Sequence, residues 1–142
     1  MTSTTMDEAV ALLTAYQDRL DRAAEESASR YDEVFANPPD GVGVHEIDQK
    51  RVIRRVNAVE PELLGYAAEQ LVGRPVHHFI VMSEASQRAI DKKLTGGPLR
   101  PFVRSFRRAD GGAVAMALVD RHLKDAAGTV VGIRTAMVRI AG

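Results

Sequence analysis

Residues Asn57–Val76 read N-A-V-E-P-E-L-L-G-Y-A-A-E-Q-L-V-G-R-P-V and contain two short helix signals in succession. Asn57 has a side chain that caps helix starts, and Gly65 can end the first helix because glycine readily adopts a positive φ. The second short helix ends in the same way at Gly73, with Pro75 just beyond it. Two small helices, each closed by a glycine, predict an unusual connection that crosses one face of a sheet.

The segments on either side predict a strand hairpin before this stretch, then a longer helix and three strands after it. Asp110-Gly111 between two strand-like runs is a strong hairpin signal. The runs rich in β-branched and apolar residues predict strands at 41–47, 51–56, 99–108, 113–124 and 130–140, with a helix over 83–94. This order predicts an α+β architecture.

The stretch resembles the centre of a PAS domain, on the residues Asn57, Leu63, Leu64, Gly65, Tyr66, Leu71, Gly73, Arg74 and Val76. The resemblance extends outward to Asp40-Gly41 on one side and to Gly132 on the other. The order of the elements is also that of the PAS family, so the resemblance implies a five-stranded antiparallel sheet with helices on one face. In that fold the short helices cover the sheet and help to wall a ligand pocket. PAS domains bind different ligands or none, so the resemblance is specific for the fold and not for the function.

Before the PAS-like region, residues 6–35 predict one long helix, because no Gly or Pro interrupts them. Apolar residues recur there at alternating spacings of three and four, as in a coiled-coil seam, and the pattern fades at Ser27 and Arg30. Such a stripe either packs on the chain's own sheet or forms a dimer. The helices that similar sensor proteins place before the PAS core favour a homodimer interface at Leu13, Tyr16, Leu20 and Ala23.

The run Asn37-Pro38-Pro39-Asp40-Gly41 breaks the helix and predicts a boundary between an N-terminal helix, 1–36, and a PAS domain, 37–142. Many relatives of such a domain continue into a linker helix and an output domain. We therefore expect the chain to be the sensor part of a longer protein.

Composition excludes several classes of function. With 19 basic and 19 acidic residues the chain has no net charge, so nothing favours nucleic acid or an anionic membrane as a partner. The 142 residues include no cysteine, which rules out disulfides and thiolate metal sites. A secretion signal and the nucleophile and phosphate-binding motifs of common enzymes are also missing. We expect a cytoplasmic protein that is not an enzyme by itself.

The resemblance implies a pocket between the sheet and its covering helices, lined by His78, Phe79, Ile80, Ile90, Leu94, Val103, Met116, Leu118 and Ile133. The same residues are equally suited to a plain hydrophobic core. Arg104 is a candidate partner for a ligand carboxylate if it points inward, although a solvated outer face is the more ordinary place for it.

The cofactor stays unknown at this point. Some haem-binding PAS domains take their iron ligand from the covering helices, so haem would use His77 or His78, but a lone pair of imidazoles is a weak signal. Covalent flavin photochemistry needs a cysteine that the chain lacks. Non-covalent flavin is not favoured, because no tryptophan is available for stacking.

Two functions remain open on this reading. The first is a sensory PAS domain of a bacterial-type signal-transduction or transcription regulator, such as a two-component system, which binds a small ligand and relays the change through a dimer. The second is a ligand-free PAS domain that acts as a dimerisation or protein-interaction module. A cavity with convergent polar groups favours the first, and a filled core with an exposed apolar sheet face favours the second.

Overall fold

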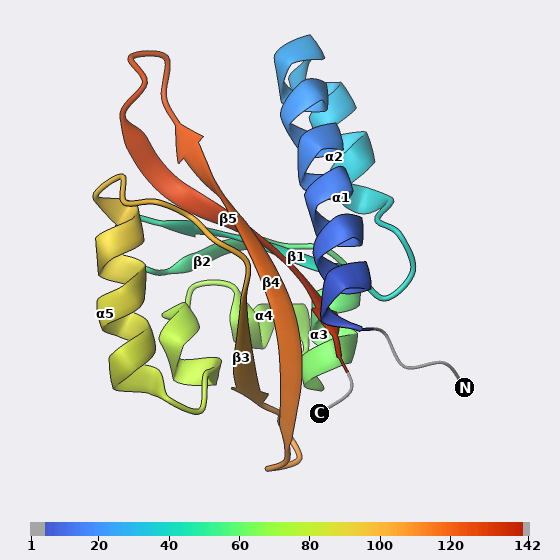
Figure 1. Cartoon of the computed structure of the whole chain (residues 1–142), viewed down its shortest axis with the longest axis vertical. Helices are drawn as coiled ribbons and strands as arrows, with labels where there is room; N and C mark the ends of the chain where they lie inside the picture. The colour runs from blue at the N-terminus through green and yellow to red at the C-terminus, as the bar shows by residue number, and fades with distance from the viewer. Residues whose placement is uncertain (1–4, 141–142) are drawn as a thin grey trace.

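The computed structural model describes residues 5–140 as a sheet with helices on both faces (Figure 1). The helices are α1 (Met6–Glu26), α2 (Ala28–Ala36), α3 (Val59–Leu64), α4 (Ala68–Leu71) and α5 (Ser83–Leu94), with a 3₁₀ helix η1 over Val76–Phe79. The strands are β1 (Gly43–Asp48), β2 (Ile53–Val56), β3 (Phe102–Arg107), β4 (Ala113–Lys124) and β5 (Val130–Arg139).

The five strands form one antiparallel sheet, as predicted, and their order within it is β2-β1-β5-β4-β3. The last strand in the chain therefore lies at the centre, between the first strand and the fourth. Gly132 is needed at the crowded junction of β1 and β5, because a Cβ there would lie 2.1 Å from the Ile47 carbonyl oxygen. Such an approach is far inside van der Waals contact, so any side chain at this position forces the strands apart.

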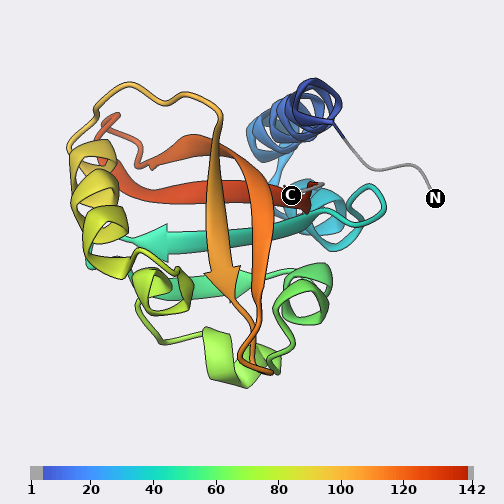
Figure 2. The same ribbon diagram turned by 60° about the horizontal axis from the view of Figure 1, so that its bottom comes forward.

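The stretch Asn57–Val76 folds over one face of the sheet as predicted. Asn57 joins this stretch to β1, because its Oδ1 accepts hydrogen bonds from the Val44 and Glu60 N–H groups and its Nδ2 donates to the Val42 carbonyl. Gly65 ends α3 with a φ of 79°, the left-handed conformation that favours glycine. α3, α4, η1 and α5 then cover this face (Figure 2).

The N-terminal segment differs from the prediction of a single helix over 6–35. The helix breaks at Ser27, whose backbone is extended (φ −172°, ψ 162°) and whose Oγ accepts a hydrogen bond from the Arg30 N–H to begin α2. Serine favours such a cap over a helix interior. The chain turns back there, and α2 runs alongside α1 (Figure 1).

The apolar stripe of α1 packs on the chain's own sheet. The residues predicted at a dimer interface, Leu13, Tyr16, Leu20 and Ala23, are each at most 3% exposed within one chain. They belong to a core cluster with Val42, which directly precedes β1, and with the outer-face residues of β1, β4 and β5, namely Val44, Ala117, Val119, Ala136 and Val138. In this arrangement the seam is intramolecular, so a dimer of this fold has to use other residues.

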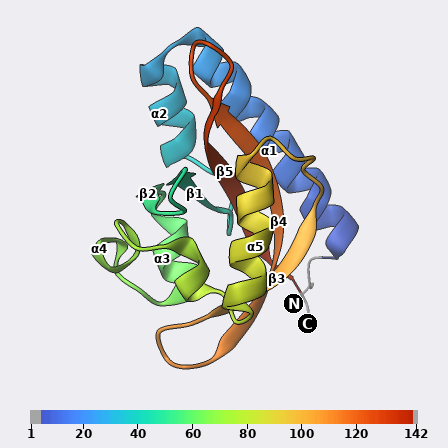
Figure 3. The ribbon, with the colours of Figure 1, turned by 90° about the vertical axis from the view of Figure 1, so that its left-hand side faces the viewer.

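Figure 3 places α5 in front of the long strands and α1 behind them. A second cluster fills the space between the sheet and α3, α4, η1 and α5, and its sheet residues include Ile47, Met116, Leu118, Ile133 and Met137. The molecule therefore has two cores, one on each side of a single sheet. No helix of the described residues is long and apolar enough to cross a membrane.

Candidate functional site

A small cavity lies in the core between the sheet and α5. Its apolar lining consists of Ile47, Val76, Ile80, Ala89, Ile90, Phe102, Phe106, Leu118 and Ile133, and its polar lining of His45, Ser86, Lys93, Arg104, Asp120 and Thr135. The cavity volume is about 30 Å³. One water needs roughly 10–15 Å³, so the space suits a few waters or a molecule of comparable size.

The predicted pocket residues divide into three groups. Ile80, Ile90, Leu118 and Ile133 line the cavity as predicted. The second group lies buried in the surrounding core without lining the cavity, namely Phe79, Leu94 and Met116. The third group, His78 and Val103, differs from the prediction, because both side chains are exposed. Val103 alternates with Phe102 and Arg104, which face the cavity, so its own side chain points away from it.

Three polar side chains cross the floor of the cavity in a row. His45 on β1 pairs in register with Thr135 on β5, and Thr135 pairs with Asp120 on β4. None of the three was among the residues predicted to line the pocket. Strand alternation would have placed His45 beside Ile47 on one face, but the row itself depends on the register between strands distant in sequence.

His45 is held by a buried carboxylate from α3. Its Nδ1 lies 2.8 Å from Glu60 Oε1 and 2.9 Å from Oε2, with the two side chains 3% and 1% exposed. Burial by itself lowers the pKa of His45, but the charge and hydrogen bonds of Glu60, aided by the charges of Asp120 and Glu46, raise it above its ordinary value. The raised pKa favours the protonated form of His45, whose Nδ1 donates to the Glu60 side chain.

The negative charge of Asp120 is balanced by Lys93 of α5, on the side of the cavity opposite α3. Its Oδ2 accepts a hydrogen bond of 2.8 Å from Lys93 Nζ on α5, and its Oδ1 accepts one of 2.6 Å from Thr135 Oγ1. The Lys93 ammonium also lies 3.5 Å from the centre of the Phe102 ring, a cation–π contact. Each buried charge of the row thus has an opposite partner on a covering helix.

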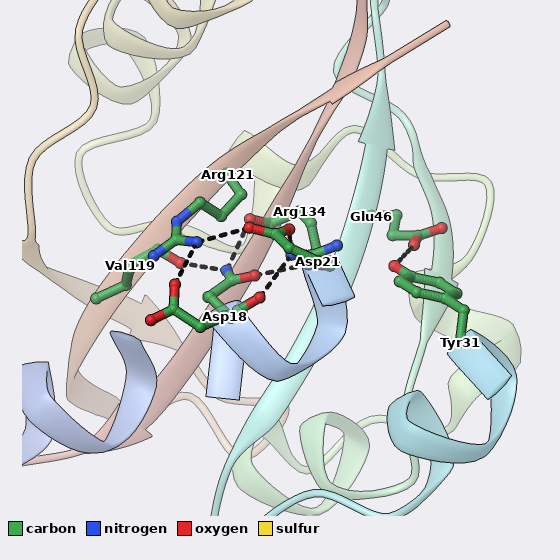
Figure 4. A network of polar contacts seen from close by, with 8 residues as sticks. Asp18, Asp21, Tyr31, Glu46, Val119, Arg121 and Arg134 are labelled. Atoms are coloured by element: carbon green, nitrogen blue, oxygen red, sulfur yellow. Dashed lines mark hydrogen bonds and ion pairs between the residues drawn. The ribbon is translucent and has the colours of Figure 1, made fainter. Parts of the chain in front are cut away.

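A second polar row lies on the outer face of the sheet, made of the sequence neighbours Glu46, Arg134 and Arg121 (Figure 4). Arg134 is 2% exposed, and its guanidinium donates to Gln17 Oε1 at 2.6 Å and to Asp21. Gln17 in turn donates to the Val119 carbonyl at 2.7 Å. These contacts fasten α1 to β4 and β5.

The two ends of the second row hold the helical hairpin, which consists of α1 and α2, in the same way. Arg121 donates to Asp18 at 3.0 Å and to Asp21 at 2.7 Å, and Tyr31 of α2 donates to Glu46 (Figure 4). The two rows lie back to back, one beneath the cavity and one beneath the helical hairpin. A displacement of the strands on one side therefore has to be accommodated on the other.

The histidines considered for haem lie elsewhere. Neither His77 nor His78 lines the cavity; both belong to η1, with their rings 5.0 Å apart. Burial and the charges of His78 and Arg51 lower the pKa of His77.

Within residues 5–140 no group of three or more His, Asp or Glu side chains is arranged to hold a metal ion. The cavity is an order of magnitude smaller than the roughly 300–1,000 Å³ pockets of drug-sized ligands.

Comparisons with known proteins identify the fold. No family model matches the chain, and no curated protein matches it. Among solved structures, the PAS domain of an HTR-like protein from Haloarcula marismortui has a TM-score of 0.64 at 21% identity, over 87% of this chain and 99% of that one. A PAS domain from Colwellia psychrerythraea has a TM-score of 0.68 at 16% identity, over 79% of this chain and 95% of that one.

A third neighbour is the PAS domain, in complex with ethanol, of a LuxR-family transcriptional regulator from Burkholderia thailandensis. Its TM-score is 0.62 at 21% identity, over 79% of this chain and 98% of that one. These likenesses, with the order of elements described above, show that the chain is a PAS-fold domain.

Proposed function

We propose that this PAS domain is a sensory module that binds a small ligand in the cavity beneath α5 and relays binding to the helical hairpin α1–α2. The observation that carries the proposal is the convergence of six polar side chains on one small cavity in an otherwise apolar core. Buried polar groups are costly unless they are paired or serve a ligand. Apolar residues of similar volume often stabilise a core as well as buried ion pairs do, so a domain that acted only as a scaffold would not need this polar cluster.

The neighbouring structures support a signalling role. Two of them come from proteins described as HTR-like and as a LuxR-family transcriptional regulator, and the latter holds ethanol, a ligand of the size that suits this cavity. By this analogy the domain passes its signal to an output domain or to a second copy of itself. The role is binding and relay, without catalysis.

The route of the signal follows the two back-to-back rows. A ligand that draws on His45, Asp120 or Thr135 alters the strands that also carry Glu46, Arg121 and Arg134. Those three residues hold α1 and α2, so ligand binding shifts the packing of the hairpin. A relay of this kind requires two arrangements of the hairpin that the ligand stabilises differently.

A nuclear magnetic resonance (NMR) experiment on the whole chain tests both parts of this proposal. We expect small polar organic molecules, added one at a time, to shift the methyl resonances of Ile90, Leu118 and Ile133, and also the side-chain amide of Gln17 on the far face. A sensor without relay would shift only the first group. If no compound shifts the cavity methyls, the sensory proposal is wrong.

Matched variants on α5 make the test specific. Ala89 lines the cavity, so Ala89→Leu fills it and should abolish the shifts. Arg88 is the preceding residue of the same helix, but it is exposed and does not line the cavity, so Arg88→Leu should leave them unchanged.

The second candidate function, a protein-interaction module, rests on a different observation. Val81, Met82 and Val103 are 40%, 66% and 40% exposed and line or border a groove beside the edge strand β3. Exposed apolar groups that gather in one place are typical of interaction surfaces. Light scattering over a range of concentrations tests self-association here: a dimer that Met82→Asp dissociates supports the second function, and a monomer at all concentrations contradicts a homodimer through this groove.

A further inference from the structure

Resting on the proposed function, we propose that the ligand is a small carboxylate, about the size of acetate or propionate, whose carboxyl group is bound by Arg104 and Ser86. The inference depends on which polar groups of the cavity are already committed to partners. Most of these groups have partners within the chain, and the two that remain, Arg104 and Ser86, both carry hydrogen-bond donors.

The charges of the floor are already balanced within the chain. His45 is paired with Glu60, and Lys93 is paired with Asp120, whose second oxygen accepts the Thr135 hydroxyl. None of these carboxylates is available to neutralise a further cation. The floor therefore adds no net charge to the cavity.

Arg104 is the cation that remains. No carboxylate of residues 5–140 lies within salt-bridge distance of its guanidinium, which donates one hydrogen bond, to the Val103 carbonyl at 2.9 Å, and lies 4.9 Å from the centre of the Phe102 ring. A guanidinium has five N–H donors in a fork that matches a carboxylate. Arg104 is only partly buried, yet it lines the cavity, so most of its donors remain for a bound anion.

Ser86 is the second polar group of the cavity that lacks a partner. It is 2% exposed and lines the same cavity, and its Oγ has no hydrogen-bond partner among the described residues. A buried hydroxyl without a partner is uncommon and calls for an explanation. A carboxylate between Ser86 and Arg104 accepts hydrogen bonds from both and satisfies the orphan group.

The same two residues lie where a ligand enters. Ile80, Ser86 and Arg104 line both the cavity and the neighbouring surface groove. A carboxyl group bound there keeps its charge close to water, while a short apolar tail contacts Ile90, Leu118 and Ile133. The cavity volume of about 30 Å³ restricts that tail to a few carbon atoms.

The test compares sodium propionate with propionamide and 1-propanol, neutral molecules of similar shape, by NMR titration of the whole chain at constant ionic strength. We expect propionate to shift the methyls of Ile90 and Leu118 and to bind at least roughly tenfold more tightly than either neutral molecule, the effect of one charged hydrogen-bonded contact. Arg104→Met should weaken propionate binding by a similar factor, and Ser86→Ala should weaken it less. Arg107→Met is the matched control, since Arg107 lies on the same strand but is exposed and faces away from the cavity.

The outcomes separate this inference from the proposed function. If propionamide or 1-propanol shifts the cavity methyls as strongly as propionate, the site binds small molecules but the carboxylate inference is overturned. Competition by chloride or sulfate at equal concentration, lost in Arg104→Met, overturns it as well, because the site is then a general anion site. If none of the molecules shifts these methyls, both the inference and the proposed function fail. Because the comparison of the three molecules uses the wild-type chain, it does not depend on the folding of any variant.

Discussion

Thr135 and Arg134 are consecutive residues of β5 whose side chains serve opposite faces of the sheet. Thr135 Oγ1 donates to Asp120 Oδ1 at 2.6 Å beneath the cavity, whereas Arg134 Nε donates to Gln17 Oε1 at 2.6 Å beneath α1. One peptide unit of the central strand thus connects the candidate ligand site with the helical hairpin. Strand geometry alone produces this arrangement, because successive side chains point to opposite faces.

The contact of Gln17 with Arg134 should make a large contribution to stability. We expect Gln17→Leu to lower the free energy of unfolding by about 2–3 kcal/mol, since it leaves a buried guanidinium and the Val119 carbonyl without the amide. Urea denaturation measures the loss. Arg22→Leu on the exposed face of α1 is the control, with an expected change within about 0.5 kcal/mol. Equal losses for the two variants would contradict a specific role for Gln17.

The buried hydroxyl of Tyr16 ties α1 to α2, because it donates to the Val34 carbonyl at 2.6 Å. Burial, only partly offset by the charges of Arg19 and Arg134, raises the pKa of Tyr16 to about 12. We expect Tyr16→Phe to cost about 1–1.5 kcal/mol in thermal or urea unfolding, because the carbonyl loses its donor.

Tyr66→Phe is the matched control for this change. The Tyr66 hydroxyl makes only a long, exposed contact of 3.4 Å with the Arg107 carbonyl, so its loss should cost less than about 0.5 kcal/mol. A larger effect at Tyr66 than at Tyr16 would refute the assignment of the buried hydrogen bond.

The pair of His45 with Glu60 should make stability depend on pH. The pKa of His45 is raised in the folded chain, so its stabilising contribution is complete below the ~6.5 of an unfolded histidine and is lost as pH rises through the folded value. We expect the difference in unfolding free energy between the wild-type chain and His45→Gln to shrink over that range. It is measured by urea denaturation between about pH 5.5 and pH 9.

Glu60→Gln tests the cause of this shift. Without the carboxylate, burial opposes the charged imidazole with less compensation, so NMR titration should report a lower pKa for His45 than in the wild-type chain. An unchanged or higher value would mean that Glu60 is not the group that raises the pKa of His45.

Removal of residues 1–41 should expose the outer face of the sheet. The freed apolar residues, Val44, Ala117, Val119, Ala136 and Val138, form a continuous surface of the kind that drives association. We expect the shortened chain to aggregate or to bind a hydrophobic dye, as measured by size-exclusion chromatography and fluorescence. A peptide of residues 5–36 added in excess should restore a soluble complex, and a soluble shortened chain that ignores the peptide would contradict the packing described here.

The fold could be predicted from sequence to a greater extent than the site. The glycines that close the short helices and the Asp110-Gly111 turn are local signals, so the order of elements follows from the chain itself. The polar row of His45, Thr135 and Asp120 joins three strands whose register no local pattern specifies. The break at Ser27 and the intramolecular packing of α1 could not be predicted for a related reason. An apolar stripe does not specify which surface covers it.

The attachment of α1 to β4 and β5 has a consequence for how this sequence can change over time. Gln17 and Arg134 are 117 positions apart, yet each satisfies the other in a place that water does not reach. A substitution at either one is tolerated only with a matching change at the other. We therefore expect these two positions to covary among homologues that keep the N-terminal hairpin, and to vary independently in homologues that have lost it.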